Sequence, residues 1–140
     1  HVEDDELLAA APANHPMAAS VRVDPDSLSG DDLILLEDGH CLRDHALAAC
    51  GLEPPRGVGD DETFAATSLP TLVQMIGSGL GVSFLPAMAV HAGLADKTAL
   101  TIRPLATEHP SREIVVAWRA GSSRGVEGRL LAETLRETEA

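Results

Sequence analysis

The sequence predicts an α/β domain with a mostly parallel β-sheet and helices packed over both of its faces. Short apolar runs typical of buried strands alternate along the chain with segments of helical periodicity. The clearest strand signal is the run at residues 113–118, and the clearest helix is the amphipathic stripe at residues 126–135. With 140 residues, of which 44% are hydrophobic, the chain can form one real core.

The first half of the chain predicts two strands and one helix. Residues 6–12 form an apolar run that a proline stops, and residues 14–25 carry the proline and aspartate pattern of loops and turns. Residues 33–36 are a continuous apolar run bounded by acids, as expected for a strand covered on both faces. A helix is expected over residues 41–50, because Gly51 follows where helix C-caps favour glycine.

The second half predicts a further helix, several strands and a closing helix. Thr67 or Ser68 is placed to cap a helix that runs to about Ile76, where glycines break it. Strands are expected at residues 63–66, 82–85, 100–102 and 113–118, and the closing helix at residues 126–135. The first strand and the last strand–helix unit are predicted to complete a neighbouring lobe whose other half lies upstream.

The acidity of the chain limits its partners. Aspartate and glutamate total 22 against 10 basic residues, for a formal charge of −12. Such a surface repels phosphate, so this piece is not expected to bind DNA, RNA or an anionic membrane by itself. No apolar run reaches the ~20 residues that span a bilayer, and no export signal is visible after His1. A start without Met indicates a piece of a longer chain, and we expect a cytoplasmic location.

A cysteine at a helix start is the most informative chemical feature. Asp38 or Gly39 is placed near the N-cap, which puts Cys41 in the first helical turn. The backbone N–H groups and the positive end of the helix dipole favour a thiolate there. His40 and Arg43 are positioned to add positive potential.

The second cysteine lies nine residues on, at Cys50. Nine residues of α-helix span ~13.5 Å and end about half a revolution out of phase, whereas a disulfide needs Cα atoms roughly 4.4–6.8 Å apart. Cys50 falls on an apolar stripe with Leu42, Ala46 and Ala49, opposite Cys41. A disulfide between the two therefore requires the helix to unwind, as in a peroxide switch through a sulfenic acid. A helix with two unrelated cysteines, one on the rim and one in the core, remains open from the residues alone.

Metal binding is not expected. Zinc needs about four converging ligands, and His40 and Cys50 do not converge with Cys41 and His45 on one helix. The sequence predicts no cofactor either, because the glycines at residues 77–81 lack the Rossmann spacing and a P-loop lysine.

Residues 35–44, with a second cysteine nine positions after Cys41, closely resemble the OxyR family of peroxide-sensing LysR-type transcription regulators. Residues 66–73 and 79–86 are similar to the wider LysR-type pattern of the effector domain. The resemblance covers most of the chain, from about Glu6 to the last helix.

The resemblance implies a periplasmic-binding-protein-like, LysR-type effector-binding domain of which this chain lacks part of one lobe. Residues 1–19 are then the strand and linker of the partial first lobe, residues 20–106 the second lobe with the redox cysteines, and residues 107–140 the return strand and C-terminal helix of the first lobe. The family's N-terminal winged helix-turn-helix is absent, so DNA is contacted only through that missing domain.

The resemblance also implies roles for single residues. Cys41 matches the family's peroxidatic cysteine, Cys50 its resolving cysteine, and His40 the histidine beside the reactive thiol. Arg119 matches an arginine near the reactive site, although without the resemblance it reads as a surface arginine after an edge strand.

The expected function is therefore a hydrogen-peroxide sensor domain of a DNA-binding regulator, not an enzyme. It switches through a reversible disulfide and forms dimers, or tetramers in the full-length protein. The main alternative is a LysR-type domain that binds a small organic effector near Thr67 and Ser68, with structural cysteines. A thiol peroxidase that turns over is a third possibility.

Overall fold

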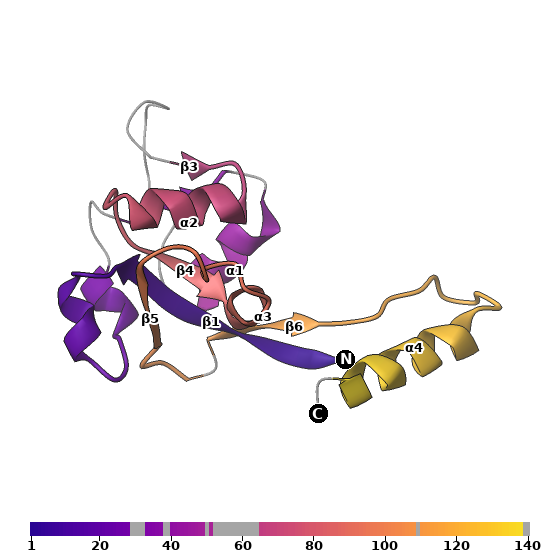
Figure 1. Cartoon of the computed structure of the whole chain (residues 1–140). Helices are drawn as coiled ribbons and strands as arrows, with labels where there is room; N and C mark the ends of the chain where they lie inside the picture. The colour runs from indigo at the N-terminus through magenta and orange to yellow at the C-terminus, as the bar shows by residue number, and fades with distance from the viewer. Residues whose placement is uncertain (29–32, 38–39, 50, 52–64, 109, 139–140) are drawn as a thin grey trace.

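One long strand, β1 (Glu3–Pro12), organises the fold seen in the computed structural model, which describes residues 1–28, 33–37, 40–49, 51, 65–108 and 110–138. Residues 3–6 of β1 pair with β6 (Ser111–Ile114). Residues 7–12 then run between β4 (Ser83–Pro86) and β5 (Leu100–Pro104). The strand thus leaves one group of elements and enters another, as Figure 1 shows.

The burial of β1 follows its sequence. Its polar first half is only partly covered, whereas Leu7 and the alanines at positions 9–11 are fully buried. Alanine side chains are small, so neighbouring layers pack closely on both faces of the strand. The other described elements are η1 (Pro16–Ala19), η2 (Pro25–Leu28), β2 (Leu35–Leu36), α1 (Cys41–Ala49), β3 (Ala65–Ala66), α2 (Leu69–Gly77), α3 (Ala87–His91) and α4 (Gly125–Thr138).

The α/β class is confirmed, but the expected predominance of parallel pairing is wrong for the described strands. β1 is antiparallel to β4, β5 and β6. Parallel pairing occurs between β2 and β3, and a parallel bridge from Leu33 to Val82 places β2 beside β4. The described strands overlap the expected apolar runs, but their lengths differ: β1 begins three residues earlier, β2 has only two residues, and β6 ends at Ile114. Their direction is invisible in a hydrophobic pattern, because burial does not depend on which way a strand runs.

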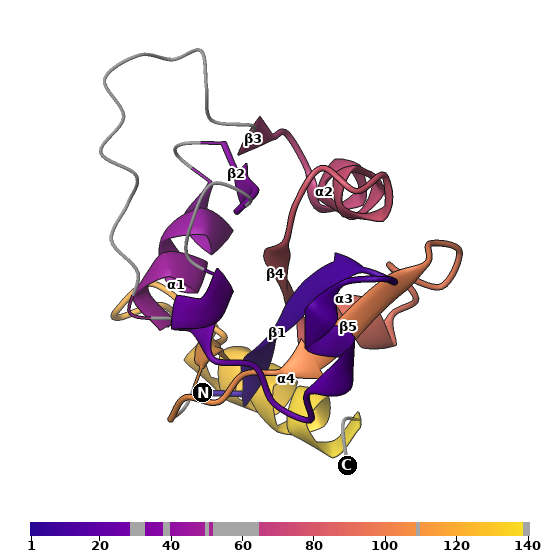
Figure 2. The same cartoon turned by 90° about the vertical axis from the view of Figure 1, so that its left-hand side faces the viewer.

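Helices α1 and α2 lie on opposite sides of strands β2 and β4, as Figure 2 shows. The predicted second helix is confirmed, because Ser68 caps α2 and its Leu72, Val73 and Ile76 are buried in the core. Helix α3 was not predicted, since it is only five residues long and follows Pro86 directly.

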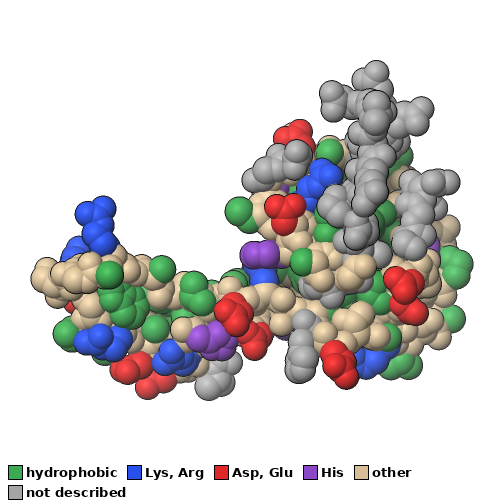
Figure 3. Space-filling model, turned by 180° about the vertical axis from the view of Figure 1, so that it is seen from behind, with side chains coloured by type: hydrophobic (Ala, Val, Ile, Leu, Met, Phe, Trp, Pro, Cys, Tyr) green, Lys and Arg blue, Asp and Glu red, His purple; other side chains and the backbone are tan. Residues whose placement is uncertain are grey.

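Helix α4 and the segment before it project from the rest of the molecule (Figures 1 and 3). The predicted closing helix lies within α4, but the predicted strand at residues 113–118 ends at Ile114. A Cβ on Gly128 would lie 2.6 Å from Cε3 of Trp118, so the indole packs directly on the helix backbone. The exposed hydrophobic residues of α4 are Val126, Leu130, Leu131 and Leu135.

Within the described residues, the longest helices are too short or too polar to serve as a membrane span. The first half of the predicted strand at residues 63–66 lies outside the described residues.

Candidate functional site

Cys41 is the first residue of helix α1. The His40 carbonyl accepts a hydrogen bond from the Arg43 backbone N–H at 2.9 Å, so the helical turn closes immediately around the cysteine. The thiol is free and exposed. The predicted position of Cys41 in the first helical turn is thus confirmed. In that turn, unpaired N–H groups and the helix dipole favour a negative side chain. The proposed caps Asp38 and Gly39 lie outside the described residues.

The opposite face of α1 is buried. Leu42 is 5% exposed and Ala46 is 5% exposed, which matches two members of the predicted apolar stripe. Cys50 and the Ala49 side chain lie outside the described residues. Gly51 has a φ of 65° and its N–H donates to the Ala48 carbonyl at 3.2 Å, so the helix ends where the sequence predicts.

The polar neighbours of Cys41 in the chain differ in their contacts. Arg43 donates from Nη1 to the Leu36 carbonyl at 3.4 Å and thus links α1 to the end of β2. His40, Asp44 and His45 are exposed. Among the described residues, no three His, Cys, Asp or Glu side chains are arranged to hold a metal ion.

Thr67 and Ser68 lie at the start of the neighbouring helix α2. Ser68 Oγ accepts a hydrogen bond from the Thr71 N–H at 3.4 Å, whereas Thr67 is exposed. Strands β2 and β3 are parallel neighbours, and Glu37 donates its N–H to the Ala66 carbonyl at 3.0 Å beyond them. Because α1 and α2 follow these strands, their N-termini lie at the same edge of the sheet. The fold therefore brings the predicted effector-binding residues to the edge that carries Cys41.

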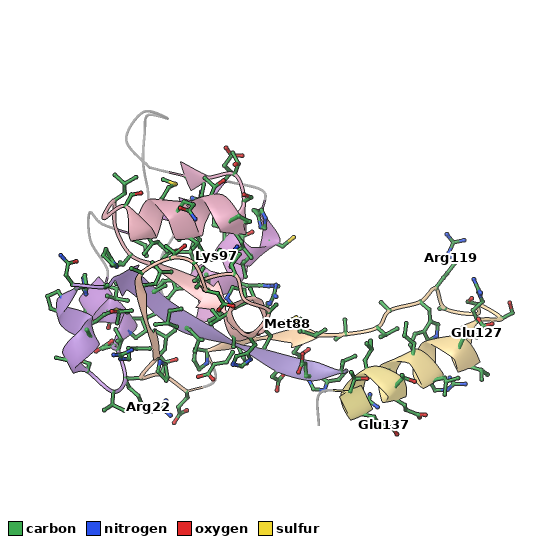
Figure 4. The ribbon with its side chains drawn as sticks, viewed as in Figure 1. Arg22, Met88, Lys97, Arg119, Glu127 and Glu137 are labelled. Carbon is green, nitrogen blue, oxygen red and sulfur yellow. The ribbon has the colours of Figure 1, made fainter. Side chains whose placement is uncertain are left out.

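Arg119 is not brought to Cys41. It lies between β6 and α4, is exposed, and sits on the projecting segment, as Figure 4 shows. Its side chain points away from the ribbon there, on the far side of β6 from the body that holds α1.

A buried ion pair at the point where β1 changes partners escaped the sequence analysis. The Asp5 side chain is 2% exposed and pairs with Arg112 Nη2 at 2.8 Å. The same carboxylate accepts the Met88 N–H at 2.8 Å and so caps α3, because Pro86 at its N-cap offers no side chain for this. A signal existed in the sequence: Asp5 stands two residues before Leu7 and four before Ala9, on the face of β1 that is buried.

Comparison with known proteins completes the description of the site. The profile of the LysR substrate binding domain matches residues 1–140. The chain belongs to the LysR substrate-binding domain family. This LysR domain is 37% identical over 134 residues to the "Hydrogen peroxide-inducible genes activator" of Pectobacterium carotovorum subsp. carotovorum, covering 96% of the chain and 43% of that relative. It is also 37% identical over 133 residues to the "DNA-binding transcriptional dual regulator OxyR" of Escherichia coli (strain K12), covering 95% of the chain and 42% of that relative.

Solved structures agree with these relatives. The reduced form of the regulatory domain of OxyR2 from Vibrio vulnificus is similar with a TM-score of 0.80 and 35% identity, over 97% of this chain and 62% of that one. The reduced form of the OxyR regulatory domain from Pseudomonas aeruginosa is similar with a TM-score of 0.78 and 34% identity, over 97% of this chain and 64% of that one. The resemblance to the OxyR family and the LysR-type, periplasmic-binding-protein-like fold are thus confirmed. The LysR domain described here spans less than half the length of the curated relatives it matches.

Proposed function

We propose that this LysR domain is the hydrogen-peroxide-sensing part of a DNA-binding transcription regulator and switches through a reversible Cys41–Cys50 disulfide. One observation carries the proposal: Cys41 is an exposed, free thiol at the first position of α1. A thiolate at a helix N-terminus is stabilised and accessible, as a peroxide-reactive cysteine requires. The relatives named above as peroxide-inducible activators support the same function.

The chemistry consumes one peroxide and two thiols. The Cys41 thiolate sulfur attacks one peroxide oxygen, the O–O bond breaks, and the departing hydroxide takes up a proton to become water. This two-electron oxidation leaves a sulfenic acid on Cys41. The Cys50 thiolate then attacks the Cys41 sulfur, the S–S bond forms, and the S–O bond breaks with loss of a second water.

Helix α1 has to open before the disulfide forms. Its nine residues place the Ala49 Cα ~12 Å from that of Cys41. The next Cα along a trans peptide lies ~3.8 Å away, so a partner at position 50 stays at least ~8 Å from Cys41 while α1 is intact. A disulfide tolerates at most ~6.8 Å. Oxidation is therefore a switch between a helical and an opened segment.

His40 and Arg119 are the proposed helpers of Cys41. His40 directly precedes Cys41 in the chain and is exposed, and its imidazole is proposed to share a hydrogen bond with the peroxide. Arg119 is proposed to stabilise the negative charge that develops on the thiolate or peroxide oxygen. That role requires the projecting segment between β6 and α4 to approach α1.

The wider assignments belong to the same proposal. Residues 1–19 and 107–140 are assigned to one lobe and residues 20–106 to the other. Strand β1 runs across this division, because residues 3–6 pair with β6 and residues 7–12 pair with β4 and β5. The sensor acts in the cytoplasm as a dimer, or as a tetramer in the full-length protein. DNA is contacted by a domain outside this chain, and the protein is a regulator rather than an enzyme, as the names of its relatives support.

Thiol titration and mass spectrometry test the switch. After one equivalent of peroxide, the wild-type chain is expected to lose both thiols and to yield a Cys41–Cys50 peptide. Cys50→Ser is expected to stop at the Cys41 sulfenic acid, which a 1,3-diketone traps. If both thiols stay free in wild type, the proposed function is wrong. Repeated consumption of peroxide with a thiol reductant would instead indicate a thiol peroxidase.

A small organic effector is the second candidate function. The observation in its favour is that exposed Thr67 and the N-terminus of α2 share one sheet edge with the start of α1. Helix N-termini attract anionic groups, so a carboxylate is the expected ligand. Thermal stabilisation by a panel of carboxylates, with a loss of that effect in Thr67→Val and with peroxide inert, would support this candidate over the sensor.

A further inference from the structure

The chain crosses between the two proposed lobes at two places. Strand β1 changes partners between Glu6 and Leu7, and residues 105–110 lead from β5 to β6. The two crossings lie side by side, because the Leu7 N–H donates to the Pro110 carbonyl at 2.6 Å. Adjacent connections of this kind act as a hinge, which joins two bodies but lets the angle between them change.

The Asp5 carboxylate adds a third connection, and this one is made by a side chain. Asp5 lies two residues before Leu7, whose register partner at the end of β4 is Pro86. Met88 lies two residues after that proline, and its N–H donates to Asp5 Oδ1 at 2.8 Å. The bond therefore continues the pairing of β1 with β4 past the end of β4. It joins the part of β1 that pairs with β6 to helix α3 of the other lobe.

Arg112 orients the carboxylate for this bond. Its Nε and Nη2 lie 2.9 Å and 2.8 Å from Asp5 Oδ2, which leaves Oδ1 to the Met88 N–H. Asp5 and Arg112 are register partners, so their ion pair belongs to the ladder between β1 and β6. The Asp5 side chain is only 2% exposed, and hydrogen bonds to a charged group are strong where little water competes for the partners. One buried carboxylate thus connects β6 to α3.

Helix α1 lies at the same junction. It belongs to the lobe proposed for residues 20–106, yet it packs beside β6 of the other lobe. A change in the angle between the lobes would therefore change the position of β6 relative to the helix that carries Cys41. The connection at Asp5 thereby bears on the surroundings of the reactive thiol.

We propose that Asp5 is a latch between the two lobes and fixes the angle at which they meet. The inference goes beyond the sensor chemistry and rests on the proposed division of the chain into lobes. With the latch closed, β6 and α3 keep the arrangement seen in Figure 1. With the latch broken, the two hinge connections remain and the lobes sample several angles.

The distance between one label on each lobe reports this angle. Nitroxide labels are attached at Lys97→Cys in one lobe and at Glu137→Cys on α4 in the other, because both side chains are exposed (Figure 4). Helix α4 follows the start of β1, since Arg136 Nε donates to the His1 carbonyl at 2.8 Å. Double electron–electron resonance then measures the distribution of distances between the labels.

The labelled protein is the full-length chain with Cys41→Ser and Cys50→Ser, mixed with excess unlabelled chain before assembly so that only pairs within one chain contribute. Asp5→Ala removes both bonds of the latch and is expected to broaden the distance distribution at least about twofold. Asp4→Ala makes the same change at an exposed position of the same strand and should leave the width unchanged. Leu72→Ala removes a buried core side chain away from the latch, so it lowers stability but should also leave the width unchanged.

Two results would overturn the latch. One is an Asp5→Ala distribution as narrow as that of Asp4→Ala, and the other is an equal broadening in Leu72→Ala. If Asp5→Ala does not fold, Asp5→Asn takes its place with Asp4→Asn as the control. Asparagine keeps an acceptor for the Met88 N–H but loses the charge that Arg112 pairs with. Its distribution is therefore expected to be broader than that of the control, and equal widths would again overturn the proposal.

The sensor function is tested separately, by thiol titration of the unlabelled protein with its native cysteines. If the latch proposal fails, a Cys41–Cys50 disulfide still forms after peroxide treatment and the sensor function stands. If no disulfide forms in wild type, the sensor function fails, whereas the distance measurement on Asp5→Ala still decides whether Asp5 holds the lobes.

Discussion

The Asp5–Arg112 ion pair makes the strongest prediction about stability. The Asp5 carboxylate is 2% exposed and accepts hydrogen bonds from Arg112 Nε at 2.9 Å and from the Met88 N–H at 2.8 Å. Hydrogen bonds to a charged group contribute about 1.5–3 kcal/mol each. Asp5→Asn keeps one acceptor oxygen but removes the charge that Arg112 pairs with. We expect it to lower the free energy of unfolding by about 2–3 kcal/mol.

Substitution of Arg112 should lower the free energy of unfolding more than substitution of Asp5. Arg112→Gln leaves a buried carboxylate without its cation, and breaking one side of a buried pair costs about 3–5 kcal/mol. The double variant Asp5→Asn with Arg112→Gln is expected to be more stable than Arg112→Gln alone, because no uncompensated charge then remains buried. A double-mutant cycle by urea denaturation measures this coupling.

A matched control comes from the exposed pair at the start of α4. Arg124 Nε lies 2.7 Å from Glu127 Oε2, but the two side chains are 80% and 64% exposed. Exposed pairs contribute about 0–1 kcal/mol, so Glu127→Gln should leave the unfolding midpoint almost unchanged. Equal losses for Asp5→Asn and Glu127→Gln would refute the reasoning, since burial would then not decide the value of an ion pair in this protein.

Three further substitutions probe other parts of the structure. Ser68→Ala removes the N-cap of α2 and should cost about 1 kcal/mol in urea denaturation; Ser68→Asp should recover it, and an equal loss in both would argue against capping. Gly128→Ala places a Cβ 2.6 Å from Trp118 Cε3, so the indole should leave α4 and its fluorescence shift to the red; an unshifted spectrum would contradict the packing. Arg119→Gln should slow Cys41 oxidation at least tenfold if the projecting segment reaches α1, and an unchanged rate would remove Arg119 from the proposed site.

The sequence could predict the features that depend on local periodicity and local chemistry. The apolar stripe on residues 41–50 needs only the 3.6-residue repeat of a helix. The placement of Cys41 in the first turn, the glycine C-cap at Gly51 and the cap of α2 at Ser68 each depend on residues within four positions. These expectations are confirmed for the described residues, Leu42 and Ala46 of the stripe included, because the forces that produce them act within one turn.

The tertiary structure decided the features that join distant parts of the chain. The direction of β1, the pairing of Asp5 with Arg112 across 107 positions, and the distance of Arg119 from Cys41 all depend on how the strands cross. Hydrophobic burial is non-directional, so an apolar run predicts that a strand is covered but not by which neighbour or in which sense. The composition and periodicity of the sequence thus determined which residues go inside. Only the tertiary structure determined which of those residues contact one another.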